Sequence, residues 1–188
     1  MVKESYSLER LADRAEIEDV MHRWCRAVDR LDFDLMRTVF HPDAVDSHGP
    51  SVFEGGVEEL ISWISGRHSS IPFCLHSLSN MLIEFAGPDT AVVETNVMSV
   101  QRLSEEGDPA IRVHEGVPGG HGMQMLAFAR YADRFERRGG EWRIQHRVMI
   151  LDSQLLIEGG EGELASGITI GRRDRTDYSY VLRSAVGL

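Results

Sequence analysis

Two residues far apart in the chain, Asp29 and His76, have the side chains that acid–base chemistry needs. Asp29 follows Met21 and Cys25 at four-residue steps, so it lies at the edge of the buried stripe of a predicted helix. His76 stands among apolar neighbours at the start of a predicted strand. A neutral imidazole can take a proton near neutral pH, and a carboxylate on its other nitrogen stabilises the imidazolium that forms. We therefore predict that His76 abstracts a proton next to a leaving group or carbonyl, with Asp29 orienting it in an apolar pocket.

Both residues also have ordinary structural interpretations, which the sequence leaves open. A core histidine can be satisfied by a backbone carbonyl, and Asp29 could cap its helix or pair with Arg26 or Arg30. Cys74 lies two residues before His76 on the same strand face. Catalysis by a Cys–His pair is not expected, because alternate residues of a strand point side by side.

The segment over residues 41–48 holds the most metal-like cluster of the sequence, formed by His41, Asp43, Asp46 and His48. Zinc and iron sites favour such side chains. The four positions straddle a predicted helix end and a short strand, so their side chains need not converge. We predict no metal and no cofactor, and we expect His48 to lie at the mouth of a pocket, with a solvated loop as the plain alternative.

Length and composition predict a single globular domain with a sizeable core. The chain has 188 residues, of which 42% are hydrophobic and 27% charged. A net charge of −10 and a pI near 5.2 argue against nucleic acid or an anionic membrane as the partner. The two cysteines give no disulfide framework, and no stretch has the length of a membrane span or the apolar core of a signal peptide. We expect a reduced, cytoplasmic protein that binds a small hydrophobic substrate.

The elements that position these groups follow from hydrophobic periodicity. Apolar residues at steps of three and four predict helices over 8–31, 33–40 and 57–66. Alternation and turn residues predict strands over 44–48, 73–85, 91–103, 123–135 and 142–151. This order predicts an α+β fold, a cone-shaped α+β barrel in which three N-terminal helices pack on a strongly curved, mainly antiparallel sheet. Such a cone has one open mouth, and a hollow of this kind suits a ligand.

Side-chain parity and aromatic positions indicate which residues line the hollow. On the strand over 91–103, the charged Glu94 and Arg102 share one parity and should face water, so alternate residues face inward. Trp24 lies about one turn before Asp29 and should share its surroundings, although aromatic residues at such spacing also occur in a plain core. Arg147 could contact an oxygen-bearing group or form a salt bridge. The residues expected to bind a substrate are Trp24, His48, Phe53, Cys74, Val97, Ser99, Phe128 and Arg147.

Several local motifs accompany this element order. They are Arg26-Ala27-Val28-Asp29, Val39-Phe40-His41-Pro42-Asp43-Ala44, Cys74-Leu75-His76 and Gly140-Glu141-Trp142-Arg143-Ile144. Together with the order of elements they resemble the SnoaL-like group of the nuclear-transport-factor-2-like superfamily, over about residues 8–152. The resemblance implies the cone fold and a homo-oligomer, a dimer or a trimer, formed through the outer face of the sheet.

The resemblance also implies an activity. Some members of the superfamily are lyases of the scytalone dehydratase, hexachlorocyclohexane dehydrochlorinase and bile-acid 7-alpha-dehydratase group. Their aspartate ends the first helix and their histidine lies on the first long strand, as Asp29 and His76 do, and Arg147 could match an arginine of their last strand. Five positions before the aspartate those lyases tend to carry Lys or Tyr, whereas this chain has Trp24, so another proton donor is needed.

These features imply a cofactor-independent lyase, of the dehydratase or dehydrohalogenase type, acting on a hydrophobic cyclic small molecule. An isomerase or cyclase with the same base is the near alternative. A non-catalytic ligand-binding or assembly subunit is the alternative from another class of protein.

The chain is predicted to divide at about residue 154. Residues 1–154 form the expected cone domain, and residues 155–188 form a tail that becomes basic and aromatic and caps the pocket or packs on a neighbouring subunit. Residues 104–122 are predicted to form a long loop, and long loops in compact domains are often functional.

Overall fold

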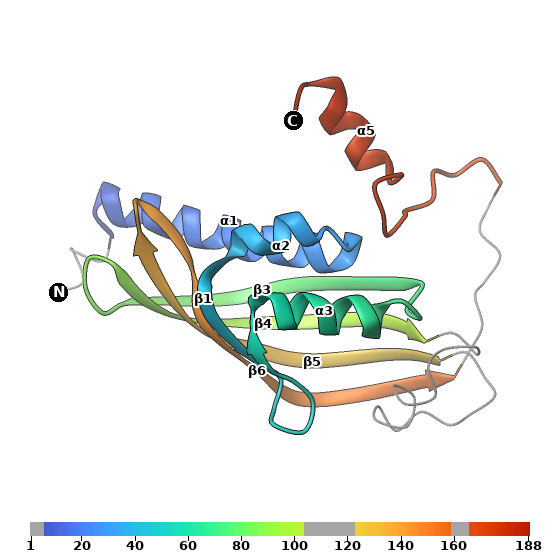
Figure 1. Ribbon diagram of the computed structural model, residues 1–188, viewed down its shortest axis with the longest axis horizontal. Coiled ribbons are helices and arrows are strands. Elements are labelled where there is room, and N and C mark those ends of the chain that lie inside the picture. Colours follow the sequence, from blue (N-terminus) through green and yellow to red (C-terminus); the bar gives the residue numbers. More distant parts are fainter. Residues whose placement is uncertain (1–5, 104–122, 159–165) are drawn as a thin grey trace.

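The computed structural model describes residues 6–103, 123–158 and 166–188, and it confirms the predicted α+β architecture. The helices are α1 (Leu8–Arg30), α2 (Phe33–Val39), α3 (Val57–His68) and α5 (Tyr178–Ala185). The strands are β1 (Phe40–Ser47), β2 (Glu54–Gly56), β3 (Phe73–Phe85), β4 (Thr90–Leu103), β5 (Met123–Arg138) and β6 (Glu141–Glu158). Helices α1, α2 and α3 lie together on one face of a strongly twisted sheet (Figure 1). The loop predicted over 104–122 lies outside the described residues.

The described strands form one six-stranded sheet in the order β2-β1-β6-β5-β4-β3. The long strands β3 to β6 pair antiparallel with their neighbours in the sheet, whereas β1 runs parallel to β6. The sheet does not close, because β2 and β3 form its two edges. The result is a half-open cone whose concave side is covered by helices.

Irregularities in the pairing account for the curvature of the sheet. The register shifts between Ser79 and Met81, where Asn80 has a positive φ of 38°, and again at two places along β5. A bulge of this kind bends its strand and increases the local twist. The concave face therefore wraps around the space under α1 and α3.

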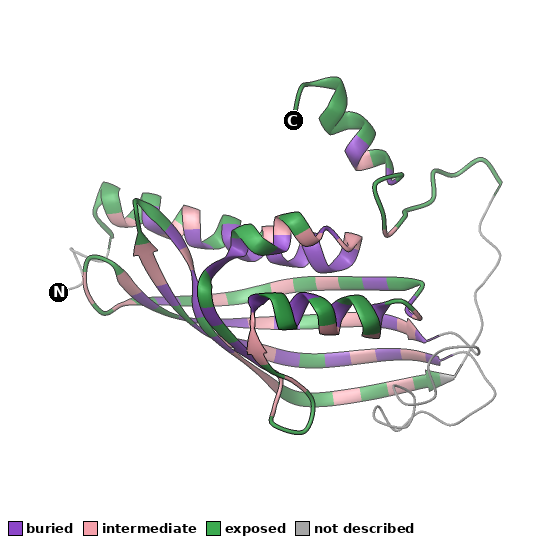
Figure 2. Ribbon diagram, in the orientation of Figure 1, coloured by how far each residue is buried: buried purple, intermediate pink, exposed green. Residues whose placement is uncertain are grey.

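The strands alternate between buried and exposed positions, as a sheet with one covered face requires. On β5 the odd-numbered residues from Met123 to Phe135 are buried, and the even-numbered ones are more exposed. Figure 2 shows the same alternation as purple and green bands along the strands. The main core, around Trp24, Phe40 and Trp142, lies between the helices and the concave face.

Helix α1 ends at a defined point, which fixes the position of Asp29. Ser7 caps its first turn by accepting a hydrogen bond from Arg10 N at 3.2 Å. Leu31 follows the last turn in the left-handed conformation, with φ at 52°, and its N–H bonds to carbonyls of that turn. Asp29 is therefore held in a rigid final turn rather than on a loop.

The C-terminal residues add a helix that the sequence reasoning did not predict. The hydroxyl of Tyr180 on α5 donates to Asp32 Oδ2 at 2.8 Å, and Arg175 donates to Oδ1 of the same carboxylate at 2.9 Å. The tail thus contacts the cap of α2, while the predicted division of the chain at residue 154 stays a prediction. Among the described helices, none combines the length and apolar character that crossing a membrane requires.

Candidate active site

Asp29 and His76 meet on the concave face of the sheet. His76 Nδ1 donates to Asp29 Oδ1 at 2.8 Å, and the backbone N–H of His76 donates to Oδ2 at 3.0 Å. Both side chains are at least nine-tenths buried. Because both carboxylate oxygens are bound, the imidazole has one fixed orientation and its other nitrogen, Nε2, points away from Asp29. This is the arrangement of a base and the group that orients it.

Strand β3 places His76 beside Cys74, since residues two apart share a face. Cys74 Sγ lies 3.7 Å from His76 Nδ1. Burial lowers the pKa of His76, but Cys74 and Asp29 outweigh burial and raise that pKa to about 10. The pKa of His76 therefore lies above that of an ordinary imidazole, which favours the imidazolium form.

Potential metal ligands also gather at this point. In the described part of the chain, one group of three such residues has its donor atoms within 4.8 Å of one another: Asp29, Cys74 and His76. Two ligands of a tetrahedral zinc ion lie about 3.3 Å apart, given bond lengths near 2 Å. Asp29 Oδ1 and His76 Nδ1 are 2.8 Å apart, which is a hydrogen-bond distance. We assign this contact to a shared proton.

The metal-like cluster of the sequence does not converge. His41 Nε2 lies 2.9 Å from the carbonyl of Glu136, and Asp43 pairs with Arg138 at 2.6 Å. Only Asp46 and His48 meet, with 2.7 Å between Asp46 Oδ1 and His48 Nδ1. This segment therefore supplies a second carboxylate–imidazole contact in place of a metal site.

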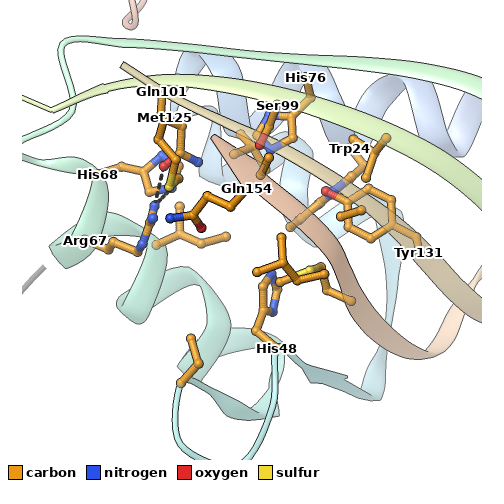
Figure 3. Close-up of a pocket in the computed structure, with 18 of the residues that line it drawn as sticks. Trp24, His48, Arg67, His68, His76, Ser99, Gln101, Met125, Tyr131 and Gln154 are labelled. Carbon is orange, nitrogen blue, oxygen red and sulfur yellow. Dashed lines mark hydrogen bonds between the residues drawn. The ribbon is translucent and has the colours of Figure 1, made fainter. Parts of the chain in front are cut away.

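A cavity of about 220 Å³ lies between the sheet and α3. His76 and His48 both belong to its wall, and Figure 3 shows the two rings on opposite sides of the space. Its other described lining residues are Trp24, Val28, Val52, Trp63, Ile64, Arg67, His68, Val97, Ser99, Gln101, Met125, Ala127, Ala129, Tyr131, Met149, Leu151 and Gln154.

Four of the residues predicted to bind a substrate line this cavity: Trp24, His48, Val97 and Ser99. The inward parity predicted for β4 accounts for Val97 and Ser99. Trp24 is 2% exposed, and its indole Nε1 has no hydrogen-bond partner among the described residues.

Three other predicted binding residues do not belong to the described wall of the cavity. Cys74 is buried next to His76, and Phe53 stacks on Trp63 with 5.1 Å between ring centroids. Phe128 faces away from the cavity, on the outer side of β5, and is 39% exposed. The prediction for Phe128 fails because it shares the outward parity of Arg130.

Arg147 is fully buried, and its guanidinium pairs with a carboxylate of this chain rather than facing the cavity. Its guanidinium makes two hydrogen bonds of 2.7 Å to the carboxylate of Asp133, the residue directly across on β5. It also packs on the rings of Trp24, Phe40 and Tyr131. The structure shows the salt bridge, which was one of the two interpretations left open for Arg147.

Sequence reasoning missed Arg67 and His68, which form a polar end of the cavity where α3 stops. Arg67 Nη1 donates to Gln101 Oε1 at 2.9 Å and lies 3.1 Å from His68 Nε2, as the dashed lines in Figure 3 mark. Arg173 from the tail reaches Nδ1 of His68 at 2.9 Å. Burial and the two guanidinium groups lower the pKa of His68 well below its ordinary value, so the ring is neutral. The positive charge of Arg67 makes this end suited to an oxygen-bearing group of a ligand.

Tyr131 is another lining residue that sequence reasoning missed. Its inward position on β5 follows from the parity that puts Arg130 and Arg134 outside, so the signal was present in the sequence. Burial raises the pKa of the Tyr131 phenol, which therefore stays protonated and can donate a hydrogen bond.

Comparisons with known proteins identify the family and the fold of this chain. The sequence profile of the SnoaL-like domain family matches residues 9–148. The uncharacterized protein Rv2910c of Mycobacterium tuberculosis is 28% identical over 145 residues, covering 76% of this chain and 87% of that protein.

Similar solved structures include two proteins of the lyase group. Hexachlorocyclohexane dehydrochlorinase LinA-type3 from Novosphingobium barchaimii superposes with a TM-score of 0.69 at 20% identity, covering 84% of this chain and 99% of that chain. A candidate scytalone dehydratase from Novosphingobium aromaticivorans superposes with a TM-score of 0.65 at 17% identity, covering 85% and 97%. At these identities the likeness establishes the fold alone.

Proposed function

This chain belongs to the family of SnoaL-like domains, as its motifs predicted, and we propose that it is a cofactor-independent lyase of the dehydratase or dehydrohalogenase type. His76 is the base that removes a proton from carbon, and Asp29 orients the ring and stabilises the imidazolium. The substrate is a small, hydrophobic, cyclic molecule held in the cavity between the sheet and α3.

The observation that carries this proposal is the contact between His76 and Asp29 at the wall of an open cavity. The 2.8 Å bond from Nδ1 to Asp29 leaves Nε2 to receive a proton from a ligand. The surroundings are apolar, so the attraction between imidazolium and carboxylate is screened less than in water. A dyad packed into a solid core would have no such access.

The protonation state sets the conditions under which this base works. Because the pKa of His76 is about 10, the neutral ring is a minor form at pH 7, about one molecule in a thousand. A base with a high pKa is intrinsically strong, which offsets part of its small population. Proton removal by His76 should therefore be faster at alkaline pH.

The size of the cavity limits the substrate. An apolar cavity of about 150 Å³ is large enough for benzene. The cavity here, about 220 Å³, fits one six-membered ring with small substituents. Arg67 and Gln101 at its polar end suit a carbonyl or hydroxyl oxygen on that ring.

Solvent-deuterium exchange into cyclohexanone, followed by NMR, tests the base without requiring the natural substrate. We expect the wild type to speed exchange at the carbon next to the carbonyl, and His76→Gln to lower the catalysed rate by about 10²–10⁴-fold. His22→Gln, which changes an exposed histidine on α1, is the matched control and should exchange at the wild-type rate. Normal exchange by folded His76→Gln would exclude His76 as the base.

The same experiment separates the alternatives. A non-catalytic subunit would bind cyclohexanone, seen as saturable shifts of cavity resonances, without speeding exchange. An isomerase or cyclase would show the same loss in His76→Gln, so a screen of cyclic alcohols, halides and ketones for release of water or halide is needed to identify a lyase.

We also propose that the protein is a homo-oligomer and acts in the cytoplasm. A row of apolar residues crosses the outer face of β3 to β6, and its members are paired in register: Leu75, Val100, Leu126 and Leu155. Leu75 and Leu155 are 45% and 51% exposed, so a second copy covering this row would bury apolar surface. Leu155→Asp should lower the mass measured by light scattering to that of one chain.

Both cysteines are free, which suits a reducing compartment, and fractionation of cells tests that location.

A further inference from the structure

The cavity has a second carboxylate–imidazole pair on the side that faces His76. Asp46 is the second-last residue of β1, and His48 follows the end of that strand. Asp46 Oδ1 lies 2.7 Å from His48 Nδ1, and Asp46 is only 2% exposed. In Figure 3 the His48 ring points into the cavity from below, and His76 lies on the far side. A ligand between them would have an imidazole on each side.

The hydrogen bonding of this second pair is incomplete. Although the atoms are close, neither oxygen of Asp46 nor Nδ1 of His48 has a hydrogen bond of normal geometry to any described residue. A buried carboxylate without a partner is costly. Arg147 makes two bonds to Asp133, and its Nη1 is buried without a hydrogen-bond partner among the described residues. The His48 ring, with Nδ1 2.7 Å from Asp46 Oδ1, is the imidazole placed against this carboxylate.

Aromatic packing holds the His48 ring in place. Its centroid lies 5.0 Å from the ring of Trp63 and 6.4 Å from that of Phe53. The His48 backbone N–H also bonds to the carbonyl of Phe53 at 2.8 Å, which closes the turn after β1. With Nδ1 against Asp46, His48 lines the cavity with the rest of its ring.

We propose that His48, oriented by Asp46, donates the proton to the departing oxygen of the substrate, so that the leaving group is a hydroxyl rather than a halide. This inference rests on the proposed function, in which His76 removes the carbon-bound proton. The preferred substrate class is a monocyclic alcohol whose hydroxyl is β to a carbonyl. A halide leaves as an anion and needs no proton, so a donor in this position has a use only for an oxygen leaving group.

The step is balanced. His76 Nε2 takes the proton from carbon, and the C–H electron pair becomes the new C=C bond. The C–O bond breaks with its electrons on oxygen, and the proton from His48 Nε2 completes a water molecule. His76 then returns a proton to solvent and His48 takes one up, so the net products are an enone and water.

Other groups of the cavity are less suited to this role. The indole of Trp24 donates hydrogen bonds but does not release a proton. Burial raises the pKa of Tyr131, which makes its phenol a weaker acid than usual. Tyr131 can bind a carbonyl oxygen, whereas His48 can transfer a proton.

Two probes that give the same product test the assignment: 3-hydroxycyclohexanone and 3-chlorocyclohexanone. Both yield 2-cyclohexenone, whose formation is followed by its ultraviolet absorbance. We expect the wild type to use both, and His48→Gln to lower the ratio of hydroxide to chloride elimination rates by about 10²-fold or more. Asp46→Asn should lower the same ratio by a smaller factor. The loss should appear in kcat for 3-hydroxycyclohexanone rather than in its KM.

The controls separate failure of this inference from failure of the proposed function. His76→Gln should lower both rates alike and leave the ratio unchanged. His146→Gln changes an exposed histidine on β6, beside β1, and should change neither rate. An unchanged ratio in His48→Gln, with His76→Gln still impaired, would overturn the donor and keep the base. Unimpaired rates in His76→Gln would overturn the base itself.

Folding of the variants is checked by the reaction itself. Deuterium exchange into cyclohexanone needs His76 but no leaving group, so measurable exchange by His48→Gln shows an assembled cavity. Imidazole added to His48→Ala should restore part of the hydroxide elimination. Absence of rescue, together with an unchanged ratio in His48→Gln, would assign His48 to substrate binding alone.

Discussion

The two carboxylate–imidazole pairs of the cavity are built in different ways. Asp29 and His76 come from the end of α1 and from β3, and the carboxylate receives both the ring and the backbone N–H of the histidine. Asp46 and His48 are two residues apart at the end of β1, and their contact lacks normal hydrogen-bond geometry. The first pair is rigid because tertiary packing places it. The second is held by the aromatic rings of Trp63 and Phe53.

This difference suits two roles. A base that must meet a carbon-bound proton benefits from one fixed orientation. A donor must follow an oxygen that moves away as its bond breaks, so some freedom in its contact with Asp46 is useful. Variants that change one pair and leave the other intact can test whether the division is real.

The largest expected effect is on the rigid pair. Asp29→Asn replaces a carboxylate that accepts two hydrogen bonds with an amide that cannot stabilise the imidazolium. We expect exchange into cyclohexanone to fall by about 10³–10⁴-fold. Asp46→Asn should affect this rate far less, because exchange needs no leaving group. Equal losses in the two variants would remove the distinction between the pairs.

The second-largest expected effect is the pH dependence of the exchange rate, which follows the protonation of His76. Its pKa of about 10 is raised above the ordinary value, so the neutral base gains population as pH rises toward 10. Below that value kcat/KM for exchange should rise about tenfold per pH unit, or about 100-fold from pH 7 to pH 9. Exchange rates measured by NMR at a series of pH values test this dependence. A profile that is flat above pH 7 would contradict the raised pKa.

The third effect concerns the contribution of Cys74 to the pKa of His76. No thiol is seen next to His48 among the described residues. Cys74 Sγ lies 3.7 Å from His76 Nδ1 and is a main cause of the raised pKa. Cys74→Ala should therefore move the midpoint of the pH profile to lower pH by about one unit, since one group that favours the imidazolium is gone. Cys25→Ala, a buried cysteine on α1, is the control. A shift of the same size in both variants would point to altered packing.

Much of the rigid pair could be predicted from the sequence, because its members follow from local patterns. The apolar periodicity of α1 places Asp29 at the edge of the buried stripe, and the strand predicted over 73–85 matches β3 at both ends. Alternation alone puts Cys74 and His76 on one face. What the pattern could not show is the hydrogen bond, since it joins elements 47 residues apart in the chain.

The features that sequence reasoning missed depend on contacts between residues far apart in the chain. The turn at Gly139 and Gly140 by itself would not pair Asp133 with Arg147, because a bulge near Phe135 shifts the register by one residue. The partner of Arg147 in its salt bridge, Asp133, was therefore hidden. The parallel pairing of β1 with β6 and the helix α5 depend on contacts between distant segments, for which a single sequence holds no periodic signal.

The smallest expected effect concerns the tail, which we propose steadies the rigid pair from outside. Arg173 donates to the backbone carbonyls of Val28, Asp29 and Ile71, and so ties the last turn of α1 to the start of β3. Arg173→Ala should lower exchange about fivefold, the equivalent of one net hydrogen bond of about 1 kcal/mol. The ratio of hydroxide to chloride elimination should not change, because Asp46 and His48 lie on the other side of the cavity. Arg172→Ala is the matched control, since only the backbone of Arg172 is seen to bond, to Asp177. A changed ratio in Arg173→Ala would mean that the tail acts on both pairs, and the two sides of the cavity would then have to be treated as one coupled site.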